Sequence, residues 1–281
     1  MTISNVLNLG AKLLSKSGVA EPRREASSLL TFVLKKEAVF LIAHPEYELE
    51  DDESDRFDET VRRRAMREPF QYIVGHQEFY GLEFEVEPGV LIPRPETEIL
   101  VEEAIAILSK HKGSRFYEIG VGSGCISVSI LHVAKSVNAV GVDISRAALN
   151  VTARNAEKHR VADRLTLKKT DVFEEPNGLF DLIVSNPPYI PDGDRESMQA
   201  EVVRFEPHTA LFGGTDGLSF IRRIVNGAPQ YLKPEGFLLI EIGFGQAAKV
   251  KDLFDSARWE DVEFLADMQD IPRIVRTQFK G

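Results

Sequence analysis

Residues 115–125 read RFYEIGVGSGC, a short run with Phe, Tyr and Ile that leads into three glycines at alternate positions. The run predicts a strand over 115–119, and the apolar periodicity that follows predicts a helix over 125–134. Glycines between a strand and a helix let the chain turn sharply and let a ligand approach the backbone N–H groups. A tight turn without a ligand can have the same sequence, so the surrounding residues must decide the role of the loop.

Asp143 favours the interpretation that the glycine loop binds a ligand. It ends the next predicted strand, 19 residues after Gly124, close to the spacing of about 20 at which a carboxylate reaches the two hydroxyls of a ribose. The loop and Asp143 together predict a nucleoside-binding crevice at the carboxyl ends of the strands. A dinucleotide oxidoreductase has the same arrangement and stays an alternative. A nucleoside-triphosphatase loop is disfavoured, because the Lys-Ser/Thr ending that holds phosphate and magnesium is missing.

Strands and helices alternate along the rest of the chain. We expect strands at 115–119, 138–142, 165–170, 180–185, 237–242 and 274–278, and helices at 125–134, 146–159, 218–232 and 246–256. Such alternation is typical of an α/β fold with a doubly wound, mostly parallel sheet that is covered by helices on both faces.

The N-terminal part of the chain has a different pattern. Residues 1–72 show helical periodicity, interrupted by glycine and proline, which predicts a small α-helical bundle. Over 73–96 the runs shorten, and a turn at Pro88 and Gly89 predicts a β-hairpin linker. The α/β domain then occupies residues 97–281.

A second polar motif follows the predicted strand 180–185, at another carboxyl end of the same sheet. It consists of Asn186, Pro187, Pro188 and Tyr189. The two prolines remove two N–H donors, which leaves carbonyl oxygens as the main groups on offer. The carbonyl oxygens of the Asn186 side chain and the Pro187 main chain could each accept one hydrogen of a planar amide or exocyclic amine, while Tyr189 packs against its flat face. The structural alternative is a rigid turn after a strand.

The composition limits the classes of function. The chain has 281 residues, one cysteine, and 44 acidic against 34 basic side chains, which gives a net charge of −10. One cysteine excludes an intramolecular disulfide and favours a reducing compartment. No stretch approaches the roughly 18 apolar residues of a membrane-spanning helix. The acidic surplus disfavours stable nucleic-acid binding, because phosphates are neutralised by lysine and arginine. No histidine pair has metal-ligand spacing, so we expect no metal site.

With these motifs the chain resembles S-adenosylmethionine-dependent methyltransferases that act on planar nitrogen, and especially the peptide chain release factor glutamine methyltransferases (the PrmC/HemK family). Further matching segments lie at 79–82, 90–98, 206–217 and 232–243, and the more specific marker is Pro-Arg-Pro-Glu-Thr-Glu at 93–98. The resemblance covers essentially the whole chain. It implies a Rossmann-like methyltransferase sheet with a helical N-terminal domain and a hairpin linker. A sister branch that modifies a ribosomal protein is also similar, but usually differs at 93–98.

The resemblance also implies roles for the site residues. The cofactor-binding residues would be Glu118, Ile119, Gly120, Val121 and Gly122 for the methionine part, Asp143 for the ribose, Asp171 and Val172 for the adenine, and Asn186. The catalytic and substrate-binding residues would be Asn186, Pro187, Pro188 and Tyr189. The chain departs from the family pattern at Glu118, where Asp is commoner, at Val121, where Thr is usual, and at Val172, where Trp is frequent. Without that tryptophan, Phe173 or the aliphatic side chain of Val172 itself must cover the adenine.

The implied function is transfer of the methyl group of S-adenosylmethionine to the side-chain amide nitrogen of the glutamine in the Gly-Gly-Gln loop of class I peptide chain release factors, which modulates translation termination. We expect a cytoplasmic monomer whose helical N-terminal domain binds the protein substrate, and no membrane or stable nucleic-acid binding. The alternatives are methylation of an exocyclic amine on nucleic acid and methylation of a glutamine on a ribosomal protein.

Overall fold

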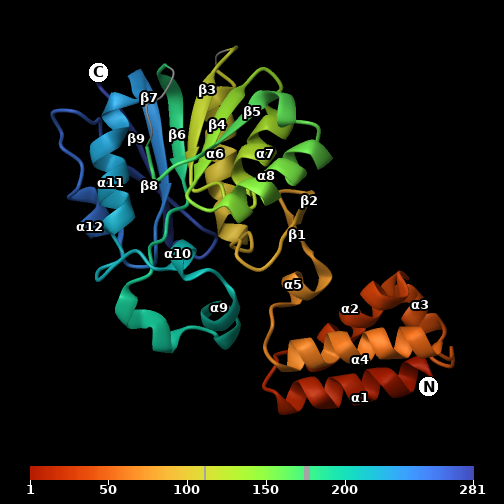
Figure 1. The fold of residues 1–281 in the computed structure, drawn as a ribbon. Helices are drawn as coiled ribbons and strands as arrows, with labels where there is room; N and C mark the ends of the chain where they lie inside the picture. The colour runs from red at the N-terminus through yellow and green to blue at the C-terminus, as the bar shows by residue number, and fades with distance from the viewer. Residues whose placement is uncertain (111, 174–177) are drawn as a thin grey trace. The chain divides into compact units, whose positions relative to one another are not determined.

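The computed structural model describes residues 1–110, 112–173 and 178–281 (Figure 1). Its contacts divide the chain into two compact units. The first joins Met1–His76 with the distant segment Gln199–Phe205, and the second joins Gln77–Met198 with Glu206–Gly281. In the part of the chain that is described, no helix has the length and apolar content to cross a membrane. The domain boundaries expected at 1–72, 73–96 and 97–281 stay a prediction.

The first unit is helical, as its sequence periodicity predicts. Its helices are α1 (Ile3–Lys16), α2 (Pro22–Leu34), α3 (Ala38–Ala43), α4 (Asp51–Ala65), α5 (Phe70–Val74) and α9 (Ala200–Phe205). The apolar faces of the longer helices share one core, which includes Ile3, Leu14, Leu29, Leu30 and Phe57. Helix α4 begins with three acidic residues and ends with three arginines, an arrangement that suits the helix dipole.

An ion cluster joins the segment Gln199–Phe205 to this unit. The Arg64 side chain is only 8% exposed and forms salt bridges with Glu25 and, at 3.2 Å, with Glu201. Arg67 pairs with the other carboxylate oxygen of Glu201 at 2.7 Å. The buried guanidinium of Arg64 therefore has carboxylates from two stretches of chain that lie 176 positions apart, from Glu25 to Glu201. No local pattern in the sequence indicates this grouping.

The second unit is built on a seven-stranded sheet in the order β5-β4-β3-β6-β7-β9-β8. The strands are β3 (Arg115–Ile119), β4 (Asn138–Asp143), β5 (Leu165–Lys169), β6 (Phe180–Ser185), β7 (Leu232–Glu241), β8 (Glu263–Ala266) and β9 (Pro272–Gln278). Strands β3 to β7 pair in parallel, whereas β9 is antiparallel to both β7 and β8. The prediction of a mostly parallel sheet is confirmed.

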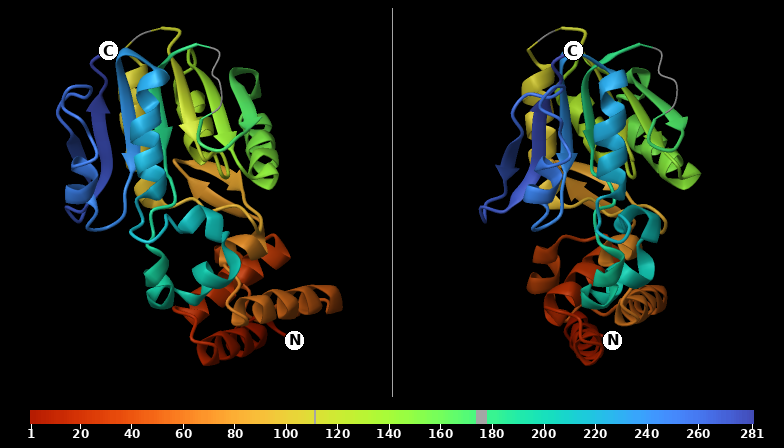
Figure 2. Two further views of the ribbon diagram at one scale, coloured as in Figure 1. Left: turned by 60° about the vertical axis from the view of Figure 1, so that its left-hand side comes forward. Right: turned by 90° about the vertical axis from the view of Figure 1, so that its left-hand side faces the viewer.

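Helices cover both faces of this sheet (Figures 1 and 2). The covering helices are α6 (Glu98–Leu108), α7 (Cys125–Val133), α8 (Arg146–Lys158), α11 (Ser219–Gly227) and α12 (Ala247–Lys251). The short helix α10 (His208–Leu211) lies beyond the carboxyl ends of the strands instead (Figure 1). Successive residues of β6 point to opposite faces, so Leu182 packs in the core beneath α6 and α7, and Ile183 packs in the core beneath α11 and α12. A sheet covered in this way is doubly wound.

The hairpin differs from its prediction. Strands β1 (His76–Phe79) and β2 (Leu82–Glu85) form a two-stranded sheet whose turn is at Tyr80 and Gly81, not at Pro88 and Gly89. Both turn residues have positive φ, 52° and 69°, as a tight two-residue hairpin turn requires. Strand β2 ends where Glu85 exchanges backbone hydrogen bonds of 2.8 and 3.0 Å with the Asn155 side chain. Pro88 and Gly89 form a separate turn, and no described strand follows it directly.

The C-terminal elements also differ in length. The helix predicted at 218–232 ends at Gly227, because Pro229 cannot continue it, and a 3-10 turn over Ala228–Gln230 leads into β7. Strand β7 starts at Leu232 instead of 237, with a register shift opposite β6 that accommodates its proline and glycine. The helix predicted at 246–256 is shortened to α12. The edge strand β8 was not predicted, since four residues at an edge carry little periodicity.

Candidate active site

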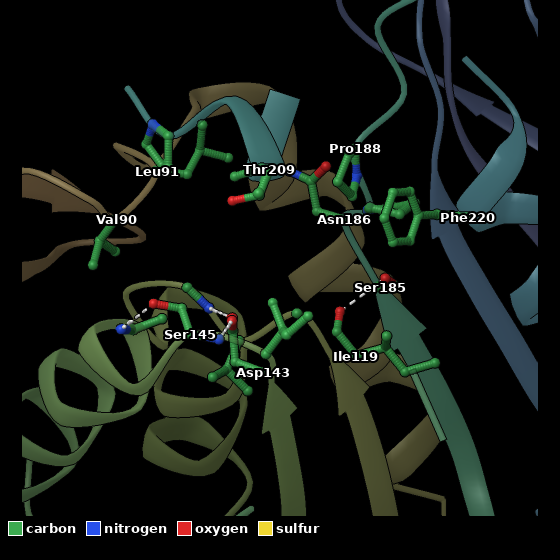
Figure 3. Close-up of a pocket in the computed structure, with 18 of the residues that line it drawn as sticks. Val90, Leu91, Ile119, Asp143, Ser145, Ser185, Asn186, Pro188, Thr209 and Phe220 are labelled. Carbon is green, nitrogen blue, oxygen red and sulfur yellow. Dashed lines mark hydrogen bonds between the residues drawn. The ribbon is translucent and has the colours of Figure 1, made fainter. Parts of the chain in front are cut away.

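The second unit contains a cavity of about 670 Å³ at the carboxyl ends of β3, β4 and β6. The connections run in opposite directions on either side of β3, and open α/β sheets bind ligands at such a point. Asp143 and Ser145 lie on one side of the cavity, and Asn186, Pro188 and Thr209 lie on the other (Figure 3). The two motifs that the sequence singles out therefore face one cavity.

The glycine loop forms the wall next to Asp143. Gly120 and Val121 both donate backbone hydrogen bonds to the carbonyl oxygen of Val142, at 2.9 and 3.0 Å, which holds the loop over the end of β4. Gly124 has a φ of 81°, and a Cβ there would lie 2.7 Å from a methyl group of Thr152. Only glycine fits at this position, where the loop passes into α7.

Asp143 fixes the other end of this wall. Its two carboxylate oxygens accept hydrogen bonds from the backbone N–H groups of Gly122, at 3.0 Å, and Ser145, at 2.8 Å. Burial raises the pKa of Asp143, and the backbone donors partly oppose that rise. Each oxygen keeps a further lone pair, so the carboxylate can still accept hydrogen bonds from a ligand that enters the cavity.

Glu118 lies behind the loop and does not line the cavity. It is fully buried, and its Oε2 accepts hydrogen bonds from the backbone N–H of Ser127, at 2.9 Å, and from the Ser127 hydroxyl. Its Oε1 has no hydrogen-bond partner among the described residues. Burial raises the pKa of Glu118 to about 8.

Asp171 and Val172, which the resemblance implies as adenine contacts, line the cavity beyond β5. Their contact with adenine stays a prediction. Phe173 does not line it, because its ring stacks on Tyr231 at a centroid distance of 4.4 Å. The phenylalanines that do line the cavity are Phe212 and Phe220. Phe220 lies on α11 (Figure 3). Sequence reasoning missed Phe220, which belongs to no motif.

The second motif contributes Asn186, Pro187 and Pro188 to the cavity. The Asn186 amide donates from Nδ2 to the hydroxyl oxygen of Thr97 at 3.1 Å. Among the described residues, nothing donates to Asn186 Oδ1 or to the carbonyl oxygen of Pro187, so both remain available as acceptors. Tyr189 is not part of the cavity lining: its hydroxyl donates to Oε1 of Glu241 at 3.3 Å. Its expected packing against a substrate stays a prediction.

Thr97 and Glu241 are further parts of the site that sequence reasoning missed. Thr97 ends the 3-10 turn Pro95–Thr97 before α6, and its hydroxyl donates to Oε2 of Glu241 at 2.6 Å. Glu241 ends β7, next to Asn186, because Ser185 and Ile240 are paired in the sheet. Both side chains are 2% exposed, and burial raises the pKa of Glu241 to about 7.

The marker segment at 93–98 is held in place by Glu206. Arg94 pairs with this buried carboxylate at 2.5 Å, and the backbone N–H of Ile92 donates to its other oxygen at 3.3 Å. Arg94 and Thr97 both line the cavity. Two of the sequence segments that carry the resemblance, 90–98 and 206–217, thus meet in one wall of the site.

Comparisons with known proteins agree with this geometry. A family model described as PrmC N-terminal domain matches residues 5–75, and one described as Methyltransferase small domain matches residues 96–206. A release factor glutamine methyltransferase of Geobacter sulfurreducens is 44% identical over 276 residues, which cover 98% of this chain and 95% of that protein. Another, from Koribacter versatilis, is 38% identical and covers 98% of both chains. The chain belongs to the release factor glutamine methyltransferase family.

The fold of this family member also matches solved structures. A methyltransferase from Pyrococcus furiosus superposes with a TM-score of 0.54 at 18% identity, over 72% of this chain and 90% of that one. The catalytic domain of hMettl16 superposes with a TM-score of 0.58 at 15% identity, over 81% of each chain. Identities this low show the fold alone. The predicted methyltransferase fold and the resemblance to the release factor glutamine methyltransferase family are both confirmed.

Proposed function

We propose that the chain transfers the methyl group of S-adenosylmethionine to the side-chain amide nitrogen of the glutamine in the Gly-Gly-Gln loop of class I release factors. The observation that carries this proposal is a pair of free acceptors, Asn186 Oδ1 and the Pro187 carbonyl oxygen, across one cavity from Asp143. An amide NH2 has two hydrogens to donate, and two carbonyl oxygens can hold both. The family to which the chain belongs acts on such a group.

The residues on the cavity wall fit the cofactor. Backbone groups of Gly120, Val121 and Gly122 would hold its methionine part, and Asp143 has lone pairs for the ribose hydroxyls. Asp171, Val172 and Phe220 would surround the adenine, with Phe220 in place of the missing tryptophan. Oε1 of buried Glu118, which has no partner within the described parts of the chain, is an acceptor that a cationic group nearby would stabilise. When bound, the cofactor supplies an electrophilic methyl group.

The protein's own contribution is to prepare and place the amide. An amide nitrogen is a poor nucleophile, because its lone pair is delocalised into the carbonyl. Acceptors that hold both N–H bonds favour a more pyramidal nitrogen and return part of the lone pair to it. The rigid prolines fix these acceptors, and the cavity excludes water while reacting atoms come within about 3 to 3.5 Å. This scheme needs no strong general base.

The remaining assignments belong to the same proposal. The helical domain, residues 1–72, binds the release factor, and the linker, residues 73–96, connects it to the catalytic domain, residues 97–281. The protein acts as a monomer in the cytoplasm. The net charge of −10 supports a protein substrate over nucleic acid. Methylation of an exocyclic amine on nucleic acid is the disfavoured alternative, because the family relatives are named for release factors.

Labelled cofactor tests the proposal. The purified chain should label a class I release factor and leave a factor with its loop glutamine changed to alanine unlabelled. Asn186→Ala should reduce turnover by about 100-fold or more, as the loss of one transition-state contact does elsewhere, with cofactor affinity retained. Asn138→Ala, at an exposed asparagine where β4 begins, is the matched control. Label on the alanine factor, or parental turnover by Asn186→Ala, would refute the proposal.

A further inference from the structure

The side chains of Thr97, Glu241 and Tyr189 form a chain of hydrogen bonds to Asn186. The links are Asn186 Nδ2 to Thr97 Oγ1 at 3.1 Å, Thr97 Oγ1 to Glu241 Oε2 at 2.6 Å, and Tyr189 hydroxyl to Glu241 Oε1 at 3.3 Å. Thr97 and Glu241 are buried, and Glu241 does not line the cavity. Neither residue is needed for the chemistry proposed above, so their role calls for a separate explanation.

The direction of these bonds follows from counting hydrogens. A carboxylate only accepts, so the single hydroxyl hydrogen of Thr97 points to Glu241. Thr97 then has only lone pairs left for Asn186, and Asn186 must present Nδ2 to it. We infer that Glu241 and Thr97 set the hydrogen-bond polarity of Asn186, keeping its Oδ1 toward the substrate amide. Both are positioning residues, and the inference rests on the proposed function.

Protonation of Glu241 would reverse this order. A neutral carboxyl can donate to the Thr97 oxygen, and the Thr97 hydrogen must then find another acceptor. Oδ1 of Asn186 becomes such an acceptor when its amide rotates by half a turn, and this rotation turns Nδ2 toward the substrate. A donor would then face the amide NH2 where an acceptor is needed, and binding of the glutamine would fail.

Several charged or titratable groups face Glu241 from the surrounding elements. Glu96 on the 3-10 turn disfavours its ionised form, whereas Arg273 on β9 favours it. Arg273 is itself paired with Asp267 at 2.7 Å. The Tyr189 hydroxyl, in the loop after β6, donates a hydrogen bond to Glu241. Cys125 on α7 is close enough that the charge of Glu241 raises the pKa of its thiol. Burial dominates, and the pKa of Glu241 is raised to about 7, within the range of an enzyme assay.

The pH profile of methyl transfer by the full chain to a class I release factor tests the inference. For the parent enzyme, kcat/KM should fall about tenfold per pH unit below a midpoint near 7. Thr97→Ser keeps a hydroxyl and should keep this acid limb. Thr97→Val breaks the chain of hydrogen bonds between Glu241 and Asn186. It should lower kcat/KM above pH 7 by at least about tenfold and abolish the fall of kcat/KM at acid pH. Glu241→Gln cannot titrate and should also lack the limb. Cofactor affinity, measured by calorimetry, should stay within about threefold and shows that each variant is folded.

The controls separate two kinds of failure. Glu118 also titrates, with a pKa raised to about 8, but it is present in every variant. An acid limb that survives in Thr97→Val or Glu241→Gln would therefore belong to another group and overturn the inference, as would loss of the limb in Thr97→Ser or a flat parental profile. If the parent labels no release factor at any pH, the proposed function itself is wrong.

Discussion

Replacing Glu118 with glutamine should remove a pH dependence from the stability of the fold. The Glu118 carboxyl is fully buried beneath the glycine loop, and its pKa is raised from 4.5 to about 8. Between these values the folded chain keeps the proton that the unfolded chain has released. The folded state therefore binds one more proton, and the free energy of unfolding falls as the pH rises, by about 1.4 kcal/mol per pH unit.

The size of the effect follows from this slope. From pH 5 to pH 8 the contribution of Glu118 amounts to about 4 kcal/mol, and above pH 8 it levels off. Glu241 adds a contribution of the same sign that ends near pH 7. Glutamine has the shape of the neutral carboxyl and cannot ionise. The stability of Glu118→Gln relative to the parent should thus increase by about 4 kcal/mol over this range.

Urea denaturation of the cofactor-free chain at pH 5, 6, 7 and 8 measures this difference. Glu102→Gln, at an exposed glutamate on α6, is the matched control and should show the parental slope. If Glu118→Gln and the parent lose stability in parallel from pH 5 to pH 8, the buried carboxyl is not the source of the pH dependence, and the reasoning from burial fails.

Three further substitutions test other parts of the structure. Asp143→Ala removes the acceptor for two loop N–H groups and should weaken S-adenosylmethionine binding by about 10- to 100-fold in calorimetry, whereas unchanged affinity would exclude its ribose role. Gly213→Ala places a Cβ 2.5 Å from two backbone carbonyl oxygens and should lower the melting temperature and activity; Gly193→Ala, with open space around it, should do neither, and equal effects would contradict the packing argument. Glu201→Ala leaves the buried Arg64 with one carboxylate fewer and should lower the free energy of unfolding of the helical unit by about 2 to 4 kcal/mol in urea denaturation. An unchanged free energy of unfolding would show that the salt bridge is redundant.

The glycine loop, its flanking strand and helix, and Asn186 could be predicted because their signals are local. A five-residue strand, a loop with three glycines and two adjacent prolines each restrict the backbone within a few positions. The mostly parallel sheet and the helices on both faces then follow from the alternation of elements. The hairpin turn was misplaced because Pro88-Gly89 is the stronger turn sequence, whereas Tyr80 adopts a positive φ that its type does not favour.

The chain of hydrogen bonds from Glu241 through Thr97 to Asn186 could not be predicted, because it joins single residues that are far apart in the sequence. Thr97 and Glu241 are 144 positions apart, and nothing in the segments 93–98 and 232–243 that contain them indicates that the two side chains meet. Only the pairing of β6 with β7 brings Glu241 beside Asn186. Phe220 was missed for another reason: a phenylalanine on an amphipathic helix is normally part of a core.

The ion cluster around Arg64 has a consequence for exchanging modules between relatives. The helical bundle is not encoded as one continuous piece, since Gln199–Phe205 belongs with it. A chimera that takes the first 76 residues from one relative and the rest from another would pair Arg64 of one protein with the residue at position 201 of the other. These two residues did not evolve together. Grafts should therefore carry both stretches together, and recombination within the family should tolerate a paired transfer better than a single crossover.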